Sequence, residues 1–128
     1  IPFVNFIHLS SRVSGTVEMG EGNIIKDGVH ISACSRLGNH IIINRGVLIG
    51  HDVTIGDYSV ASPGVNIAGN VTIGPRTFIG QGAILVPNIT IGTGCYIGAG
   101  SLVNRNLPDR VRVVGSPVKI IERDIEEF

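Results

Sequence analysis

The chain has 128 residues, which is enough for one domain. Ten basic and ten acidic residues give no net charge, and this argues against a nucleic-acid partner, because such proteins carry a cationic surface. No apolar run approaches the roughly 18 residues of a membrane span and no signal-peptide pattern is visible, so we expect no membrane partner. Two cysteines, Cys34 and Cys95, make no disulfide framework, and we expect reduced thiols in a cytoplasmic protein.

A six-residue repeat runs through most of the chain. Every sixth residue from Ile7 to Val103 is large and apolar, apart from the small Ala61. Glycine often follows this position, and the residue four places after it is small or β-branched. This period is the hexapeptide β-helix pattern, in which each hexad is a short strand plus a turn and three hexads close one triangular coil. We therefore predict an all-β fold, with a parallel β-helix of a little over five coils over residues 1–103.

The last part of the chain departs from the repeat. Residues 104–119 hold two prolines, three arginines and a lysine, and we expect a loop there. Residues 120–128, with the sequence IIERDIEEF, read as a short acidic helix. We assign residues 104–128 as an extension of the same domain.

The expected packing restricts where a site can lie. Ile, Leu and Val fill the inside of the coils, so a ligand has to bind on an outer face. An uninterrupted prism exposes flat faces that favour association about a symmetry axis. We therefore expect a homotrimer with sites at the subunit junctions.

His51 is the histidine whose surroundings best suit catalysis. Residues 18 apart stack about one strand spacing, ~4.8 Å, from each other, so Ala33 and Gly69 are the neighbours of His51 in adjacent coils. Both are small and leave room for a substrate beside the imidazole. Asp52 follows directly, and a neutral imidazole beside a carboxylate is a suitable general base near neutral pH. A solvated His-Asp pair on a turn is the alternative that spacing alone leaves open.

The other histidines do not indicate a metal site. His30, His40 and His51 fall in different columns of the 18-residue stack, and the chain has no His-x₄-His pair. We therefore expect no metal.

Several longer segments resemble the bacterial hexapeptide-repeat sugar acetyltransferases. They are IINRGVLIGHDVTIGDYSVASPGVNIAGNVTIG, FIGQGAILVPNITIG, YIGAGSLV and VVGSPVK. The nearest group is that of sialic-acid O-acetyltransferases and UDP-4-amino-sugar N-acetyltransferases, and the resemblance covers essentially the whole chain. It implies a left-handed coil, acetyl-CoA as the donor substrate, and transfer to an amine or hydroxyl of a sugar that can be linked to a nucleotide.

The resemblance also implies roles for individual residues. His51 matches the base that takes a proton from the acceptor, and Asp52 matches its acidic partner. Asn44 matches a residue that contacts the acceptor. Gly69 matches the glycine whose N–H faces the thioester carbonyl. The remaining residues expected to contact the cofactor are Gln81, Ala99 and, with Arg105, Arg110 and Arg112 near the coenzyme A phosphates, Lys119.

This sequence departs from the group at three places. Gly50 stands where related sequences often carry a polar residue, and Val60 stands where they often carry a second histidine. The group also places a small α/β domain before the β-helix, and no segment here has that character. We expect either the C-terminal part of a longer enzyme or an enzyme with a different acceptor. The rival hypotheses are an acetyltransferase for a non-sugar acceptor such as an amino acid, and a non-catalytic structural β-helix.

Overall fold

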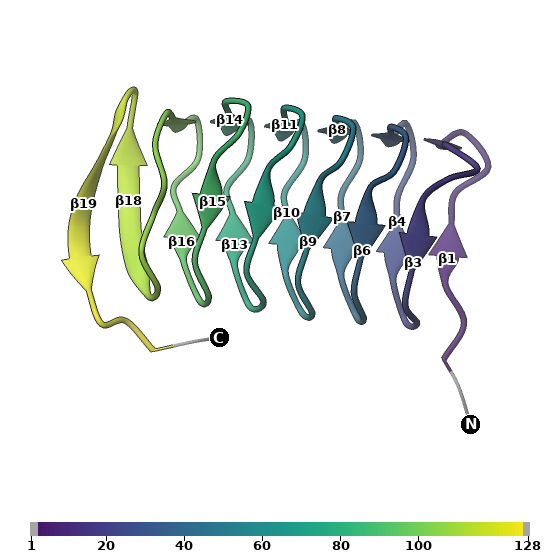
Figure 1. Ribbon diagram of the computed structural model, residues 1–128, viewed down its shortest axis with the longest axis horizontal. Coiled ribbons are helices and arrows are strands. Elements are labelled where there is room, and N and C mark those ends of the chain that lie inside the picture. Colours follow the sequence, from purple (N-terminus) through teal and green to yellow (C-terminus); the bar gives the residue numbers. More distant parts are fainter. Residues whose placement is uncertain (1–2, 127–128) are drawn as a thin grey trace.

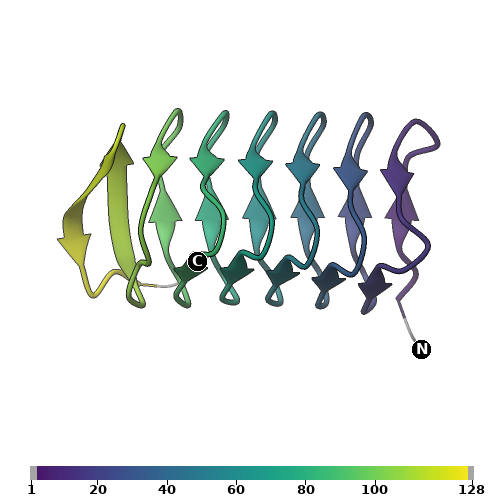
Figure 2. The same cartoon turned by 45° about the horizontal axis from the view of Figure 1, so that its top comes forward.

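The structure is a computed structural model that describes residues 3–126. It is a parallel β-helix, a prism of stacked coils with the N-terminus at one end and a longer two-stranded hairpin at the other (Figures 1 and 2). The described residues form strands and turns, with no helix long and apolar enough to cross a membrane. The predicted all-β solenoid is confirmed, and the arrangement is consistent with a left-handed coil.

Three sheets form the sides of the prism. Sheet A contains β1 (Phe6–Ile7), β4 (Ile24–Ile25), β7 (Ile42–Ile43), β10 (Val60–Ala61), β13 (Phe78–Ile79), β16 (Tyr96–Ile97), β18 (Val111–Gly115) and β19 (Val118–Arg123). Sheet B contains β2 (Arg12–Val13), β5 (His30–Ile31), β8 (Leu48–Ile49), β11 (Asn66–Ile67), β14 (Ile84–Leu85) and β17 (Leu102–Val103). Sheet C contains β3 (Glu18–Met19), β6 (Arg36–Leu37), β9 (Thr54–Ile55), β12 (Thr72–Ile73) and β15 (Thr90–Ile91).

The strands pair in parallel with a constant offset of one coil. Leu48 lies opposite Asn66, and Thr54 lies opposite Thr72, so each residue stacks on the one 18 positions later. The backbone hydrogen bonds follow the same rule: Gly50 N–H donates to Ile67 O at 2.8 Å. The predicted columns of aligned residues are therefore present in the structure.

The second residue of almost every short strand points inward and forms the core. From Ile25 onward these residues are buried, including Ala61, which is 2% exposed. The residues four places later complete the interior, as at Val53 and Val71, which have no exposed surface. The interior is continuous from one coil to the next, and this confirms that a ligand has to bind outside it.

The corners of the prism turn through left-handed backbone. A residue with φ between 54° and 73° recurs every six positions from Gly22 to Gly100. The A–B corner, between sheets A and B, uses only glycine at this position, at residues 28, 46, 64, 82 and 100. The other two corners include residues with side chains, such as Asp52 (φ 55°) and Tyr58 (φ 62°). Asp and Asn adopt this conformation more readily than most residues, and a tyrosine there is unusual.

The predicted helix over residues 120–128 is wrong. Val118–Arg123 form β19, which pairs antiparallel with β18 and extends sheet A beyond the last coil (Figure 1). Val118 is buried and Ile120 half-buried, so they alternate with exposed residues in the two-residue period of a strand. Arg112 Nε also donates to Glu122 Oε1 at 2.9 Å across the hairpin. Pairing with the exposed edge of β18 outweighs the local helical preference, and residues 127–128 of the predicted helix lie outside the described chain.

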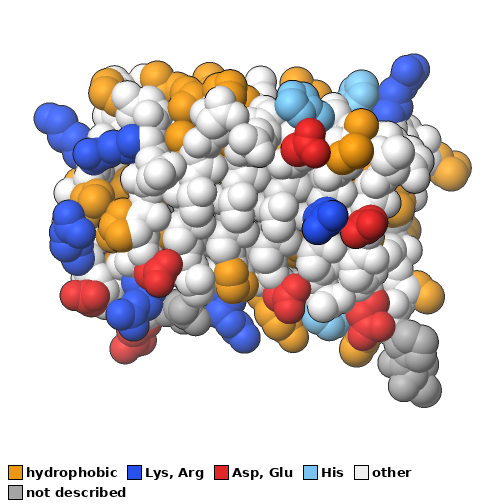
Figure 3. All heavy atoms as spheres, in the orientation of Figure 1, with side chains coloured by type: hydrophobic (Ala, Val, Ile, Leu, Met, Phe, Trp, Pro, Cys, Tyr) orange, Lys and Arg blue, Asp and Glu red, His pale blue; other side chains and the backbone are white. Residues whose placement is uncertain are grey.

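The three faces differ in polarity. The outward residues of sheet A from β1 to β16 are all apolar or aromatic, and Phe6 and Ile24 are 60% and 39% exposed. On sheet C the outward residues are Glu18, Arg36 and three threonines. Figure 3, with sheet C toward the reader, shows a central surface that is mostly uncharged and not hydrophobic. Sheet A is therefore the face best suited to burial against another chain.

We expect Ile73→Ala to destabilise the fold strongly, because the Ile73 side chain is only 1% exposed in the middle of the prism. Removing a buried isoleucine side chain costs about 2–5 kcal/mol. The neighbouring Thr72→Ala is the matched control, since Thr72 is exposed on the same strand. Chemical denaturation checks both variants, and equal stabilities would contradict the assignment of Ile73 to the core.

Candidate functional site

His51 and Asp52 lie on the corner between sheets B and C, directly after β8. His51 Nδ1 is 2.9 Å from Asp52 Oδ2, and the two side chains are 68% and 58% exposed. An ionised carboxylate only accepts hydrogen bonds, so this contact places the imidazole proton on Nδ1. Nε2 then carries a free lone pair, and within the described chain it has no hydrogen-bond partner.

The His51 ring lies over Gly69 in the next coil. A Cβ built on Gly69 would stand 2.6 Å from His51 Nε2 and 2.9 Å from Cε1, closer than side-chain atoms approach each other. The missing side chain therefore lets the ring adopt this position. The predicted stacking of His51 beside a small residue is present, and it puts the reactive nitrogen next to backbone.

The backbone N–H of Gly69 is free. Within residues 3–126 it donates no hydrogen bond, whereas Gly69 O accepts one from Asn88 N at 3.1 Å. A Cβ at Gly50 would lie 2.7 Å from Gly69 N, so the glycine there keeps the surroundings of this N–H open. A free donor beside a free imidazole nitrogen can bind an oxygen that gains negative charge.

Polar residues continue the column of Asp52 along the same corner. Asn70 Nδ2 donates to Asn88 Oδ1 at 2.9 Å, and Asn70 N donates to His51 O at 2.8 Å. Cys34 occupies the same column one coil before Asp52 and is exposed. The corner thus offers a row of polar groups beside the imidazole.

Asn44, Gln81 and Ala99 lie on a different edge, the A–B corner. The Asn44 side chain is half-buried, and its Nδ2 donates to Ala61 O at 3.0 Å. Gln81 and Ala99 are exposed. Within one chain the structure therefore separates these three residues from His51, Asp52 and Gly69.

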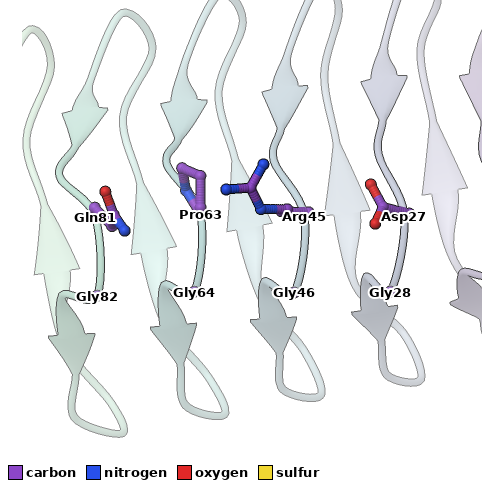
Figure 4. Close-up of a pocket in the computed structure, with 8 residues that line it drawn as sticks. All are labelled: Asp27, Gly28, Arg45, Gly46, Pro63, Gly64, Gln81 and Gly82. Atoms are coloured by element: carbon purple, nitrogen blue, oxygen red, sulfur yellow. The ribbon is translucent and has the colours of Figure 1, made fainter.

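An open groove of about 500 Å³ runs along the A–B corner. Its floor is the row of glycines, and its side chains come from Asp27, Arg45, Pro63 and Gln81 (Figure 4). The four side chains stand one coil apart in a single column, as the 18-residue stacking requires. This groove includes the predicted cofactor residue Gln81, although it lies away from His51.

The basic residues near the C-terminus have different surroundings. Arg112 contacts Glu122 and the Tyr96 ring, and Arg110 Nη2 lies 3.7 Å from Asp124. Arg105 Nη2 donates to Val118 O at 3.5 Å. Lys119 is exposed on β19 and makes no ion pair within the described chain, so its ammonium is available to a ligand.

A second hollow, of about 270 Å³, lies on sheet B beside the His51 turn. His30, Ser32 and Asn66 line it, together with Gly50 and Ala68, which directly precede His51 and Gly69. Sequence analysis did not assign these three polar residues to a site. The signal that could have found them is positional: His30 and Asn66 are 18 residues from Leu48, the outward residue of the strand that leads to His51.

Other reactive groups do not form a further cluster. No set of three His, Cys, Asp or Glu side chains within residues 3–126 is placed to hold a metal ion. His40 stacks on Tyr58 with ring centroids 5.2 Å apart, on the corner between sheets C and A. Burial raises the pKa of the Cys95 thiol, which contacts Pro108 O at 3.1 Å.

Comparison with known proteins identifies the repeat and its relatives. Residues 52–86 and 70–105 match the family described as bacterial transferase hexapeptide (six repeats). No curated protein was found to match the chain. The structure of PerB from Caulobacter crescentus, in complex with CoA and GDP-perosamine, is 42% identical, with a TM-score of 0.94 over 95% of this chain and 59% of that chain.

A second solved structure gives the same result. The acetyltransferase domain of PglB from Neisseria gonorrhoeae FA1090, in complex with acetyl coenzyme A, is 30% identical, with a TM-score of 0.93 over 94% of this chain and 59% of that chain. This chain therefore spans about three-fifths of the length of each of these two chains. It is a hexapeptide-repeat β-helix, and its resemblance to sugar acetyltransferases with this repeat is confirmed.

We expect Gly69→Ala to displace the His51 ring, because the new methyl group would overlap Nε2. Gly15→Ala is the matched control: Gly15 lies in the same column, and a Cβ there meets nothing within 4 Å. Nitrogen-detected NMR of the histidine rings should show changed His51 resonances in Gly69→Ala only. Unchanged resonances would mean that the ring does not rest on Gly69.

Thiol labelling should distinguish the two cysteines of the folded chain. Iodoacetamide should modify Cys34 quickly and Cys95 slowly, because Cys95 is buried and its raised pKa leaves less thiolate at pH 8. Mass spectrometry of tryptic peptides measures both rates. Labelling in denaturant, where both thiols should react alike, is the control, and equal rates without denaturant would contradict the burial of Cys95.

Proposed function

We propose that this chain is the β-helix part of an acetyltransferase that moves the acetyl group of acetyl-CoA to an amine or hydroxyl of a nucleotide-linked sugar. The observation that carries the proposal is the contact of the His51 imidazole with both Asp52 and Gly69. The similarity to PerB and to the PglB acetyltransferase domain supports the choice of donor and acceptor class, because those structures hold CoA with GDP-perosamine and acetyl coenzyme A.

His51 is the proposed general base. Its Nε2 would take the proton of the acceptor amine or hydroxyl while that group attacks the thioester carbonyl carbon. Asp52 would hold the imidazole by Nδ1 and stabilise the imidazolium that forms. PerB has also been solved as GDP-perosamine N-acetyltransferase with one histidine replaced by Ala or by Asn, which agrees with a histidine of functional interest in that enzyme.

Gly69 N–H is the proposed oxyanion donor. When the new bond to the carbonyl carbon forms, the carbonyl oxygen gains the negative charge, and a free N–H beside it stabilises that charge. Collapse of the tetrahedral intermediate then breaks the C–S bond. Coenzyme A leaves as the thiolate and takes up the proton held by His51, so the transfer is direct and needs no acyl-enzyme.

The other predicted site residues fit this scheme if two subunits share each site. Asn44, Gln81 and Ala99 lie on the A–B corner, whereas His51 lies on the corner between sheets B and C. We propose a homotrimer in which the A–B corner of one subunit faces His51 of its neighbour. The apolar outward column of sheet A supplies a surface for such an assembly.

The donor would then run along the A–B groove, past Gln81 and Ala99, with Lys119 near its phosphates. The groove is floored by glycines, so the pantetheine arm can approach the backbone closely. An acetyl-CoA-dependent reaction and two thiols that form no disulfide also support a cytoplasmic location.

Replacing the proposed base tests the mechanism. We expect His51→Ala to lower kcat by about 10²–10⁴-fold, the typical contribution of a general base, while acetyl-CoA still binds. The assay is the release of coenzyme A with GDP-perosamine and with UDP-linked 4-amino sugars as acceptors, and calorimetry measures donor binding. His40→Ala, on another corner, should keep full activity. Activity of His51→Ala within a few-fold of wild type would contradict the proposal.

Mixed trimers test whether two subunits share a site. His51→Ala and Asn44→Ala should each be nearly inactive alone. Co-expressed, they should recover up to about one quarter of wild-type activity, because random mixing leaves about one junction in four with both side chains. Circular dichroism and sedimentation confirm that each variant is folded and trimeric. No recovery in purified mixed trimers would contradict the shared site.

A further inference from the structure

A trough crosses sheet B on the N-terminal side of His51. It consists of two neighbouring hollows, of about 270 and 610 Å³, that have His30 and Ser32 in common. The first hollow reaches Gly50, next to His51, and the second reaches Arg12 on β2. We call this continuous surface, from Gly50 to Arg12, the sheet-B trough.

The lining of the sheet-B trough is polar. It presents hydroxyl groups from Ser11, Ser14 and Ser32, an amide from Asn66 and an imidazole from His30. These groups donate and accept hydrogen bonds, as the recognition of a hydroxylated ring requires. The sheet-B trough is therefore chemically different from the apolar face of sheet A.

Arg12 gives one end of the trough a positive charge. The described chain offers it no ion pair, whereas Arg36, at the outward position of a strand on sheet C, lies 3.6 Å from Glu18. No acidic residue lines either hollow of the trough. A planar guanidinium with free donors binds phosphate oxygens well, often with two parallel hydrogen bonds.

We propose that the sheet-B trough is the acceptor subsite and that Arg12 binds the phosphate of a sugar phosphate or sugar nucleotide. This inference rests on the function proposed above and adds where the acceptor lies and how its anionic part is recognised. The sugar ring lies over Ser32 and between His30 and Asn66. The group to be acetylated reaches His51 across Gly50.

The length of the trough agrees with this assignment. Arg12 and Leu48 lie on β2 and β8, which flank β5 in sheet B, so they are two strand spacings, or roughly 10 Å, apart. His51 follows Leu48 around the corner. A pyranose ring with its attached phosphate spans a comparable length, so one acceptor can touch both ends.

Binding of nucleoside diphosphates tests the inference directly. GDP and UDP serve as probes, because they carry the diphosphate without the reacting group. Calorimetry on the full chain saturated with coenzyme A should show that Arg12→Ala weakens binding of the probe by about tenfold or more. Arg36→Ala, the matched control on sheet C, should bind as wild type does.

Kinetics with GDP-perosamine and UDP-linked 4-amino sugars give a second readout. Arg12→Ala should raise the KM of the acceptor about tenfold, while kcat and the KM of acetyl-CoA stay near wild type. A general folding defect would change all three quantities. Arg12→Lys, which keeps the charge, should recover part of the affinity.

Failure of this inference is distinguishable from failure of the proposed function. If wild type transfers acetyl groups but Arg12→Ala binds the probes and the acceptor as well as wild type does, the phosphate lies elsewhere and the inference is wrong. The same holds if wild type binds acetyl-CoA but neither diphosphate. If wild type binds no acetyl-CoA at all, the proposed function fails, and this inference fails with it.

Discussion

The stacking of each coil on the next in an 18-residue register is the constraint on which the structure depends. Every coil donates backbone hydrogen bonds to the following coil, as Gly50 N–H does to Ile67 O. A side chain is therefore surrounded by residues fixed at 18 positions before and after it. The size and polarity of a column decide both how the interior packs and what an outer corner can bind.

The candidate site follows from this constraint in one column. His51 can lie against backbone only because Gly69 occupies the next coil, and Gly50 keeps Gly69 N–H accessible. The Asp52 backbone adopts a left-handed conformation that an aspartate tolerates, and from there its carboxylate reaches Nδ1. The reactive groups thus sit on a rigid corner that the core holds in place, rather than on a flexible loop.

Much of this arrangement could be predicted from the sequence. The six-residue period assigned the inward positions, and the 18-residue offset placed Ala33 and Gly69 beside His51. The rotation of the imidazole over Gly69 depends on side-chain geometry that spacing does not contain. Asn44 and His51 differ by seven residues, which is one hexad plus one, so their separation on two corners was readable from the repeat. Their joint role comes from the family resemblance, and a second subunit is needed to reconcile it with the structure.

The C-terminal hairpin was mispredicted because its state depends on a neighbour distant in sequence. Residues 120–126 have no repeat of their own, and β18 offers them a free edge to pair with. The antiparallel hairpin also has a consequence for the growth of the solenoid. The parallel ladder ends at β18, so further hexads cannot be added beyond it without losing the hairpin. Duplication of a whole coil inside the prism, by contrast, would lengthen it by one strand spacing and keep every column aligned, so such proteins can change length in units of 18 residues.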